Sequence, residues 1–456
     1  MQKSEASQKR KVHFISLGCP KNLVDSEMMI GSLVNSEYEI TDDASKAETI
    51  IVNTCGFIED AKKESISTIF EMAKMKEEGD LKQLVVAGCL TQRYKDSLVE
   101  ELPEADVFVG SGEFQNIAKI LEENRQDKTK KKFFHLPTFL QQETTPRINS
   151  QLPHRAYLKI SEGCLKRCAF CAIPKIRGNL QSRSLNHIVS EAKLLASSGV
   201  KEINIISHDF TDYGWDLRRK DETRKESPTE LLRQISDVKG LDWIRVLYLY
   251  PDGITREMVQ LIKERANLVK YFDMPLQHIN NEMLKRMNRK MTKEEIVTVL
   301  DMIRQEIPEA VIRTQFIVGF PGETEEQFQE LLDFVKEQKF DRVGCFKYSP
   351  EESTAGGKMT DQIDEDIKED RFHRLMSLQL PISRKNHKKL VGTIQDVIVE
   401  GISEESELLL KGRTSQQAPD IDGIVYINEG DAKVGDRVRV EITDSMDYDL
   451  IGRIVQ

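Results

Sequence analysis

Short apolar runs alternate with longer polar stretches of helical character in the first third of the chain. An apolar run this short fits a buried strand, and the stretch after each one is long enough for a helix. Strands that alternate with helices predict a parallel α/β sheet. Since such connections are nearly always right-handed, the strands should all end at the same sheet edge. The expected strand and helix pairs are residues 12–17 with 25–33, 49–53 with 60–75, and 83–87 with 91–101.

A second series of the same kind follows an irregular stretch. Residues 124–154 contain a basic run at 128–132 and three prolines, which mark a domain boundary. Six strand-like segments then recur between helical ones, which favours an incomplete (βα)6 barrel of the TIM type over the full eight. We expect the charged stretch 216–230 to be a solvated loop insertion. The six strands are expected at 156–160, 202–207, 243–250, 269–274, 311–318 and 341–348.

The last part of the chain changes to short alternating segments separated by turn residues, a pattern typical of a small all-β barrel. The predicted fold class is therefore α/β, with an N-terminal parallel α/β domain at 11–150, a partial βα barrel at 151–385 and a β-barrel at 386–456. The five strands of this last domain are expected at 392–400, 406–411, 423–427, 437–443 and 449–455.

Composition narrows the class of protein. The chain has 456 residues, 39% of them hydrophobic and 31% charged, which excludes collagen-like, low-complexity and disordered classes. No apolar run approaches the roughly 18–20 residues of a membrane span. The polar start of the chain lacks the apolar core of a signal peptide, so we predict a cytoplasmic protein. A net charge of −10 argues against a general nucleic-acid binder.

Three of the seven cysteines stand close together, as Cys164, Cys168 and Cys171, with Phe170 before the last. Disulfides are not expected in a reducing compartment. Three thiolates at this spacing can hold three corners of an iron–sulfur cube and leave one iron open to an exchangeable ligand. A structural zinc site is the weaker interpretation, because it usually needs four protein ligands. Three unrelated core cysteines would not need this tight spacing.

Three other cysteines, Cys19, Cys55 and Cys89, each come just after one of the first three predicted strands. Ligand sites of open α/β sheets lie at the carboxyl ends of strands, so these residues can converge although they are far apart in sequence. A single cysteine at such a position is usually a small core residue, and that is our prediction for Cys345 inside an apolar strand. Three at matched positions favour a shared role.

The CxxxCxxC loop after the first barrel strand resembles that of radical S-adenosylmethionine (SAM) enzymes. The resemblance implies a 4Fe-4S cluster on Cys164, Cys168 and Cys171, whose open iron binds SAM and splits it to a 5′-deoxyadenosyl radical. The segment 317–323, Ile-Val-Gly-Phe-Pro-Gly-Glu, resembles the strand and turn that hold the adenosyl part of SAM. The resemblance thus implies SAM contacts by four residues: Ser207, His208, Ile317 and Gly319.

With the three distant cysteines added, the chain resembles methylthiotransferases over roughly residues 11–456. That family has a cysteine-bearing α/β domain, a radical SAM barrel and a C-terminal TRAM β-barrel. The resemblance implies a second 4Fe-4S cluster on Cys19, Cys55 and Cys89, whose open iron carries the sulfur. It also implies two uses of SAM, as methyl donor and as radical source, together with an electron donor and a sulfur source. No catalytic side chain is assigned.

Local motifs indicate the substrate. The segment 18–27, Gly-Cys-Pro-Lys-Asn-Leu-Val-Asp-Ser-Glu, resembles the branch that modifies small-subunit ribosomal protein twelve, as do residues 248–251, 274–278 and 346–351. This resemblance implies methylthiolation of the β-carbon of an aspartate in that protein. His208 stands where the branch usually has Gln, so its role stays open between a SAM contact and a packed, hydrogen-bonded side chain.

Charge offers an independent check on the substrate. Residues 390–456 hold six basic and fourteen acidic residues, a net charge of −8, which leaves −2 for the rest of the chain. Such a domain repels phosphate and suits a basic ribosomal protein, so nucleic acid is not the expected primary substrate. A merely solvated acidic surface is the alternative. The rival functions are a tRNA-adenosine methylthiotransferase and a non-catalytic iron–sulfur protein.

Overall fold

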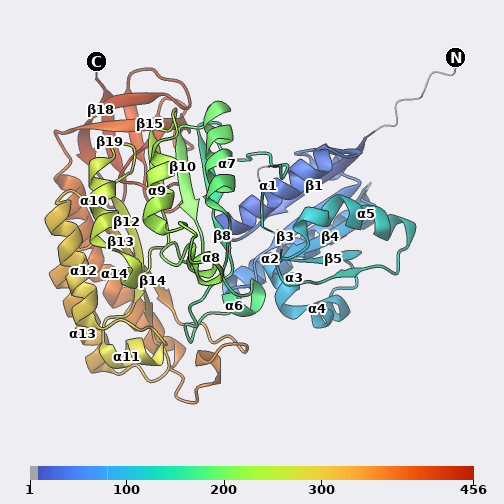
Figure 1. Cartoon of the computed structure of the whole chain (residues 1–456), viewed down its shortest axis with the longest axis horizontal. Coiled ribbons are helices and arrows are strands. Elements are labelled where there is room, and N and C mark those ends of the chain that lie inside the picture. Colours follow the sequence, from blue (N-terminus) through green and yellow to red (C-terminus); the bar gives the residue numbers. More distant parts are fainter. Residues whose placement is uncertain (1–8, 80, 139, 143, 456) are drawn as a thin grey trace. The chain divides into compact units, whose positions relative to one another are not determined.

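The structure is a computed structural model that describes residues 9–455 except Asp80, Phe139 and Glu143 (Figure 1). The contacts within the chain divide it into two units, and each is described by itself. The first unit comprises the chain up to Ser150 with two later segments, Lys159–Arg167 and Cys171–Arg183. The second unit comprises Gln151–Leu158, Cys168–Phe170 and Ser184–Gln456.

The first unit contains a six-stranded sheet in the order β2-β1-β3-β4-β5-β6, and every neighbouring pair is parallel. The three strands expected from the apolar runs are present as β1, β3 and β4, adjacent to one another. The expectation of a parallel α/β domain is thereby confirmed. The strands are β1 Arg10–Ser16, β2 Tyr38–Ile40, β3 Thr49–Thr54, β4 Gln83–Gly88, β5 Val107–Gly110 and β6 Lys132–Phe133.

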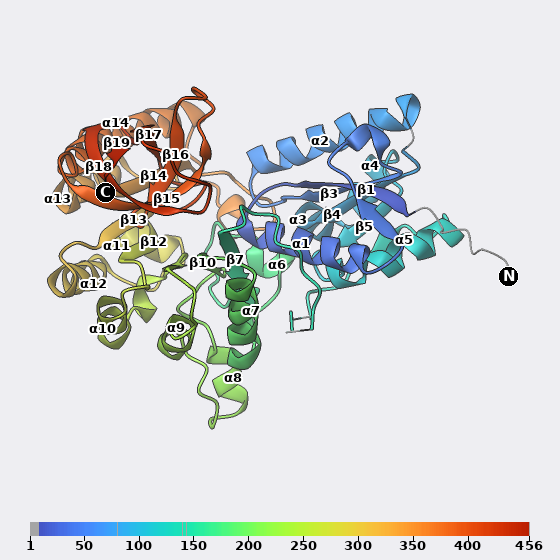
Figure 2. The ribbon, with the colours of Figure 1, turned by 90° about the horizontal axis from the view of Figure 1, so that it is seen from above.

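Helices cover both faces of this sheet, with α1 and α5 on one face and α2 and α4 on the other (Figure 2). The helix expected over 91–101 is interrupted, because Lys95 takes a left-handed backbone conformation (φ 49°) between α3 and α4. The elements are α1 Pro20–Val34, 3₁₀ helix η1 Ala44–Lys46, α2 Glu59–Glu78, α3 Cys89–Tyr94, α4 Asp96–Glu101, η2 Phe114–Asn116 and α5 Ile117–Gln126.

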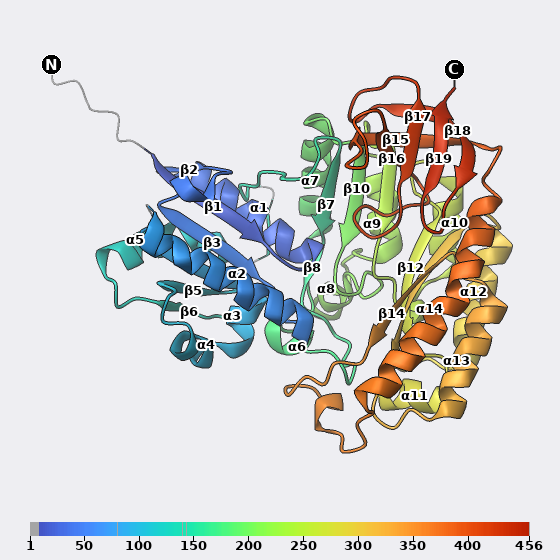
Figure 3. The ribbon, with the colours of Figure 1, turned by 180° about the vertical axis from the view of Figure 1, so that it is seen from behind.

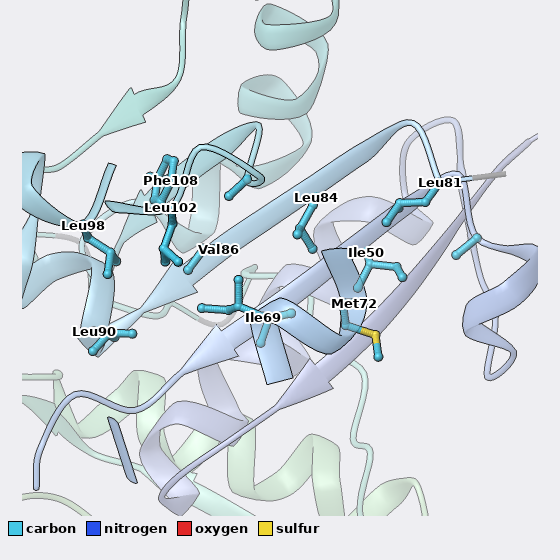
Figure 4. Packing of buried hydrophobic residues seen from close by; sticks show 13 residues of the cluster. Ile50, Ile69, Met72, Leu81, Leu84, Val86, Leu90, Leu98, Leu102 and Phe108 are labelled. Carbon is cyan, nitrogen blue, oxygen red and sulfur yellow. The ribbon is translucent and has the colours of Figure 1, made fainter. Parts of the chain in front are cut away.

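Apolar side chains between the sheet and α2 form the core of this domain (Figure 4). Ile50 and Leu84, from β3 and β4, are fully buried, and they belong to one cluster with Ile69 and Met72 of α2. Burying side chains of this size stabilises the fold by about 1.5–3 kcal/mol each. This packing holds the strand ends of β3 and β4 in a fixed arrangement.

The later segments of the first unit form a small substructure of their own. Strands β8 (Ser161–Glu162) and β9 (Gln181–Ser182) pair in antiparallel fashion. Between them lie the first and third cysteines of the CxxxCxxC loop and the short helix α6 (Ile173–Ile176). The first unit therefore contains chain from both sides of residue 150, and the domain limits 11–150, 151–385 and 386–456 stay a prediction.

The second unit contains six parallel barrel strands in two three-stranded sheets, β11-β10-β7 and β12-β13-β14. A bridge between Ile244 and Leu268 joins the sheets, and the surrounding helices complete a partial βα barrel (Figures 1 and 3). The expected incomplete (βα)6 barrel is confirmed. The strands are β7 Arg155–Lys159, β10 Glu202–Ile206, β11 Trp243–Val246, β12 Tyr271–Gln277, β13 Val311–Val318 and β14 Arg342–Lys347.

The helices of this barrel follow its strands, and the last one, α14, runs along β14 toward the C-terminal domain (Figure 3). The barrel helices are α7 Leu185–Ser197, α8 Trp215–Lys220, α9 Pro228–Ser236, α10 Arg256–Glu264, α11 Asn281–Arg286, α12 Lys293–Glu306, α13 Glu325–Gln338 and α14 Glu365–Lys388, with the 3₁₀ helices η3 Pro251–Gly253 and η4 Gly356–Lys358.

The charged stretch 216–230 is not simply a solvated loop. It begins in helix α8, and Glu226 is buried rather than exposed. Arg218 donates to the backbone carbonyl of Glu226, and Arg224 Nε donates to its carboxylate at 3.0 Å. The expectation was wrong at this point because paired charges can fold back on one another and leave the solvent.

The C-terminal domain is a closed barrel in the order β15-β16-β17-β19-β18, as expected from the short alternating segments. Its interior is filled by apolar side chains that include Val397, Val425 and Val440. The strands are β15 Ile394–Ile402, β16 Leu410–Thr414, β17 Val425–Glu429, β18 Arg437–Ser445 and β19 Leu450–Ile454.

Buried ion pairs join this β-barrel to the amino-terminal ends of the βα-barrel strands. Arg413 Nη2 lies 2.6 Å from Glu202, the first residue of β10, and Arg413 Nε donates to Glu400 at 2.9 Å. Arg155, the first residue of β7, donates to the same Glu400 at 3.1 Å. Arg245 Nη2 lies 3.5 Å from Glu202. We call Arg155, Glu202, Arg245, Glu400 and Arg413 the docking network.

Two acidic residues of the C-terminal domain thus turn toward the βα barrel rather than the solvent. Glu400 belongs to the docking network, and Asp422 accepts a 2.6 Å hydrogen bond from the Tyr271 hydroxyl. The excess of acidic residues therefore serves docking in part. No helix in the described part of the chain is long and apolar enough to cross a membrane.

Candidate functional site: two sets of cysteines

Cys19, Cys55 and Cys89 lie at the carboxyl ends of three adjacent parallel strands. Cys19 caps the start of α1 after β1, Cys55 follows β3 directly, and Cys89 begins α3 after β4. The strands are hydrogen-bonded neighbours in the order β1-β3-β4, so all three residues reach the same edge. The three sulfurs are close enough to interact electrostatically. The structure therefore brings these sequence-distant cysteines together.

Two glycines make this close approach possible. Gly18, next to Cys19, has φ +89°, and a Cβ there would lie 2.7 Å from the Cβ of Cys55. Gly88, next to Cys89, has φ +100°, and a Cβ there would lie 2.3 Å from Asn53 Oδ1. Both positions need a left-handed backbone and lack room for a side chain. A larger residue at either position would push the cysteines apart.

The thiols of this set are shielded from water. Burial, with the nearby Cys89 and Cys19, raises the pKa of Cys55 to about 12. Burial also raises the pKa of Cys89, although the charge of Arg177 opposes this. Thiols in such a place bind a metal by releasing their protons, and the positive charge of the metal then stabilises the thiolates. The donor set, three thiols at one edge, fits an iron–sulfur cube with one iron not bound by protein.

A buried group of charged residues lies directly behind Cys89. Lys159 Nζ contacts both Asp25 and Glu162, and Arg177 Nη1 donates to Asp25 at 2.6 Å. All four side chains are at most 4% exposed. We call Asp25, Lys159, Glu162 and Arg177 the cysteine-side network. From the sequence, Asp25 was included in a motif but given no role. Lys159, Glu162 and Arg177 were not predicted as site residues.

A signal for these missed residues does exist in the sequence. Lys159 is a charged residue inside the apolar run that forms β7, where a buried lysine needs a partner. The pattern of apolar and polar positions cannot identify that partner, because Asp25 is 134 positions away in the chain.

The CxxxCxxC loop is held from several sides. In the first unit, the Cys164 backbone N–H donates to the Gly178 carbonyl at 3.2 Å, and Arg167 donates to the Cys164 carbonyl at 2.7 Å. Cys164 is buried, whereas Cys168 and Cys171 are partly exposed. Hydrogen bonds to the loop backbone thus keep a short loop in one shape while two sulfurs stay accessible.

The middle of the same loop is fixed within the second unit. The Ala169 N–H donates to the Met287 carbonyl at 2.8 Å, and its carbonyl accepts from the Gly356 N–H at 2.7 Å. Arg289 Nη1 lies 3.9 Å from Cys168 Sγ, and its guanidinium stacks 4.0 Å from the Tyr250 ring centre. A positive charge therefore faces the sulfur of Cys168.

The four residues expected to contact SAM lie at the carboxyl ends of two barrel strands. Ser207 and His208 follow β10 directly; Ser207 is buried and His208 is partly exposed. Ile317 is near the end of β13, and Gly319 follows that strand. Ile317 packs against the same apolar cluster as Ala169 and Phe170, the neighbours of Cys168 and Cys171 in the loop. The structure thus brings Ile317 to the cysteine loop.

Gly319 has a structural reason to be glycine. Its φ is +71°, and a Cβ would lie 2.3 Å from the Cγ of Lys368 on α14. Its N–H donates to Glu323, whose carboxylate also accepts from Arg371 and lies 3.0 Å from His278 Nε2. The Gly-Phe-Pro-Gly-Glu turn is therefore built around a buried carboxylate.

The remaining cysteine, Cys345, lies inside β14 and is 8% exposed, as expected for a core residue. Burial raises its pKa to about 12. Among the described residues, no three or more His, Cys, Asp or Glu side chains are grouped as they would be around a single metal ion.

Three known families match consecutive parts of the chain. Residues 11–110 match an uncharacterized family designated UPF0004, residues 158–335 match the radical SAM superfamily, and residues 391–455 match the TRAM domain. The matches follow the order of the three domains expected from the sequence.

Relatives of known name match almost the whole chain. A protein of Bdellovibrio bacteriovorus named ribosomal protein uS12 methylthiotransferase RimO is 68% identical over 99% of both chains. Proteins of the same name from Geobacter sulfurreducens (50% identical, over 99% of this chain and 100% of that protein) and Clostridioides difficile (47% identical, over 98% and 99%) are also similar.

Solved structures of distant relatives share the fold. The radical SAM methyltransferase TsrM from Kitasatospora setae has a TM-score of 0.51 at 14% identity, over 86% of this chain and 78% of that one. The cobalamin-dependent radical SAM enzyme OxsB, in its apo form, has a TM-score of 0.53 at 13% identity, over 83% and 56%. At this identity the likeness concerns the fold alone.

Proposed function

The chain belongs to the ribosomal protein uS12 methylthiotransferase family, a family of radical SAM enzymes, and we propose that it transfers a methylthio group to the β-carbon of an aspartate in uS12. The observation that carries the proposal is the presence of two separate three-cysteine sets. One lies at the carboxyl edge of the N-terminal sheet and the other in the loop that follows the first strand of the βα barrel.

We assign a 4Fe-4S cluster to each set. Cys164, Cys168 and Cys171 would hold the cluster that binds SAM, and Cys19, Cys55 and Cys89 would hold the second. When bound, these groups supply one-electron chemistry at an unactivated C–H bond, which amino-acid side chains cannot provide. Membership of the radical SAM superfamily supports the first cluster and SAM. The convergence of Cys19, Cys55 and Cys89 supports the second.

The chain's own residues bind and orient these groups. In this proposal Ser207 and His208, which follow β10, contact the polar end of SAM, and Ile317 and Gly319, at the end of β13, contact its adenosyl part. Arg289 presents a positive charge to the sulfur of Cys168. The backbone hydrogen bonds of Ala169 fix the loop that carries the ligands, which positions the reacting atoms before substrate arrives.

We propose that the acidic outer surface of the C-terminal barrel attracts the basic uS12. Besides Asp420, which pairs with Arg155, eight acidic side chains of this domain are exposed, and opposite charges speed encounter between proteins. The docking network fixes this barrel at the amino-terminal ends of the βα-barrel strands, whereas the candidate SAM contacts are at the carboxyl ends. In this proposal the C-terminal barrel therefore attracts uS12 and takes no part in the chemical step. The eight residues are Asp396, Glu404, Glu405, Glu407, Glu429, Asp431, Asp436 and Asp444.

The proposal also places the protein in the cytoplasm with its ribosomal substrate, and it requires an electron donor and a sulfur source. The decisive experiment offers uS12 and tRNA together to the reconstituted enzyme with SAM, sulfide and a reductant under anaerobic conditions. Mass spectrometry should find the methylthio group on an aspartate of uS12. The Cys168→Ala variant serves as the inactive control. A methylthio group found only on tRNA would overturn the choice of substrate.

Iron analysis tests the cluster assignment by itself. Two cubes require about eight irons per chain, and removal of one cysteine set should leave about four. About four irons in the unaltered chain would show a single cluster and contradict the two-cluster assignment.

A further inference from the structure

One buried arginine uses its whole guanidinium group between Cys89 and the cysteine-side network. Arg177 Nε and Nη2 each lie 3.3 Å from Cys89 Sγ, and Nη2 also donates to Asn22 Oδ1 at 3.1 Å. Nη1 donates to Asp25 Oδ2 at 2.6 Å and to Glu162 Oε2 at 3.4 Å. A guanidinium has five N–H groups. The five contacts account for all of them, so the orientation of this side chain is fully determined.

The acceptor of the guanidinium fork is unusual. Two parallel N–H donors normally meet a carboxylate or phosphate, and a neutral thiol is only a weak acceptor. Arg177 is 1% exposed, and a buried guanidinium is costly unless its partners carry negative charge. Within the network, the charges of Lys159 and Arg177 already balance those of Asp25 and Glu162. The other two N–H groups, on Nε and Nη2, point at Cys89 Sγ and can donate to this sulfur when it ligates a cluster.

The chain path explains how this arginine reaches the first cysteine set. Arg177 follows α6, six positions after Cys171 of the loop. Ile176 and Ala172, from the same turn, pack directly against Cys89. One short segment thus supplies a ligand of one cysteine set and a contact to a ligand of the other. This contact lies entirely within the first unit.

We propose that Arg177 is a positioning residue of the N-terminal cysteine site: its two N–H groups hold the Cys89 thiolate in place and raise the reduction potential of the cluster bound there. The inference rests on the proposed function, because it requires a cluster on Cys19, Cys55 and Cys89. Hydrogen bonds to a ligand sulfur withdraw negative charge from the cluster and so favour its reduced form. Asp25 acts in the opposite direction, because its negative charge lies on the far side of the same guanidinium.

The test isolates the N-terminal cluster in the full-length chain. Cys164, Cys168 and Cys171 are replaced by Ala, the protein is reconstituted, and the cluster is titrated with one electron from dithionite while electron paramagnetic resonance records the reduced form. In this background Arg177→Gln should keep its iron but show a lower potential. We expect the reduced-to-oxidised ratio at a fixed potential to fall about tenfold, which is about 59 mV for one electron.

Two further variants separate the effect of the paired N–H groups from the effect of the positive charge and from a general loss of structure. Arg177→Lys keeps the charge but cannot present two parallel N–H groups to one sulfur, so it should recover less than half of the shift. Asp25→Asn leaves the fork and removes a negative charge, so it should raise the potential. If Arg177→Gln does not fold, as judged by circular dichroism, Arg177→Lys and Asp25→Asn carry the test.

Arg183→Gln is the matched control. Arg183 is also 1% exposed and lies in the same segment, but it donates to the backbone carbonyls of Gln141 and Lys159 rather than to a sulfur. Its removal should leave the potential unchanged.

Each contrary outcome has a definite meaning. An unchanged potential in Arg177→Gln, full recovery by Lys, or a fall in potential with Asp25→Asn overturns the inference and leaves the proposed function standing. If no cubane forms in the background variant, the assignment of the second cluster fails, and the inference fails with it.

Discussion

Two buried ion networks hold distant parts of this chain together, and they differ in what they face. The docking network joins the C-terminal barrel to the βα barrel through Arg413, Glu202 and Glu400. Arg245, another member of this network, also donates to the backbone carbonyl of Ser415. The cysteine-side network lies within the first unit, where it joins Asp25 of α1 to Lys159, Glu162 and Arg177, and its arginine contacts the sulfur of Cys89. Burial of charge is common to both, so it does not by itself mark a functional site.

A contact to a cysteine sulfur, rather than the burial of charge, separates the functional network from the structural one. A buried ion pair is weak evidence for stability, since burying the charges costs about as much as their attraction gains. Breaking either network should nevertheless destabilise the fold, because an unpaired charge remains inside. Only changes in the cysteine-side network should also alter the properties of bound iron.

The largest effect is expected from a cysteine of the N-terminal site. Cys89→Ala removes one of three ligands at the sheet edge, so iron content should fall by about half and methylthio transfer should be lost. Cys345→Ala is the matched control, because this cysteine is buried to a similar extent but lies within β14. Iron analysis and mass spectrometry of uS12 measure the two effects. Unchanged iron in Cys89→Ala would remove Cys89 from the ligand set.

The next largest effect concerns the docking network. Glu202→Gln leaves Arg413 and Arg245 without their shared charged partner, which should lower the free energy of unfolding by about 3–5 kcal/mol. Urea denaturation measures this loss, and iron content per folded chain should not change. Glu257→Gln is the control, because that carboxylate is 68% exposed and should contribute less than about 1 kcal/mol. A large loss of iron in Glu202→Gln would show that the two networks do not differ as proposed.

Acid should weaken the docking network in a defined range of pH. Burial opposes the ionisation of Glu400, but His154, Arg413 and Arg155 together lower its pKa from 4.5 to about 2. Arg413, at 2.8 Å, is the stronger partner, because His154 Nε2 lies 3.9 Å away, beyond hydrogen-bond distance. Since the folded pKa is below the unfolded one, the stabilisation is complete above pH 4.5 and is lost as the pH falls toward 2.

The expected size of this pH effect is on the order of 2–3 kcal/mol. Denaturation of the unaltered chain and of Glu400→Gln at several pH values measures it, and the difference between the two should shrink between pH 4.5 and 2. A difference that stays constant over this range would contradict the role assigned to Glu400.

The smallest effect is expected at the exposed margin of the same interface. Asp420 lies 2.9 Å from Arg155 Nη2 but is 58% exposed, so solvent screens the pair. Asp420→Asn should change the free energy of unfolding by less than about 1 kcal/mol in urea denaturation. A loss as large as that of Glu202→Gln would show that exposure does not separate the strong from the weak contacts here.

The strands and helices could be predicted from local patterns of apolar and polar residues. Apolar runs identified β1, β3 and β4, the six barrel strands and the alternating C-terminal strands, because a buried strand requires apolar residues wherever it lies. The pattern failed where charge pairs replace apolar burial, as in the stretch from 216 to 230, whose Glu226 is buried against Arg224. The pattern also predicted one helix over 91–101, where the structure has two. A single residue with a left-handed backbone, Lys95, separates them, and the apolar pattern gives no sign of it.

The charge of the C-terminal domain shows a similar limit. Its excess of acidic residues is evident from composition and predicts an outward surface for a basic partner. The structure turns Glu400 and Asp422 toward the βα barrel and leaves others, such as Glu404 and Glu405, exposed. Composition counts charges, whereas only the fold decides which of them meet solvent.

By itself the sequence determined which cysteines are candidates, because the CxxxCxxC spacing and the positions after strand ends are local features. It also determined that Cys19, Cys55 and Cys89 can converge, since parallel strands end at one edge. Only the tertiary structure decided that Arg177 lies against Cys89 and that Asp25 and Lys159 pair behind it. Those contacts join residues 88, 134 and 152 positions apart, so they depend on strand order and packing, which no local pattern encodes.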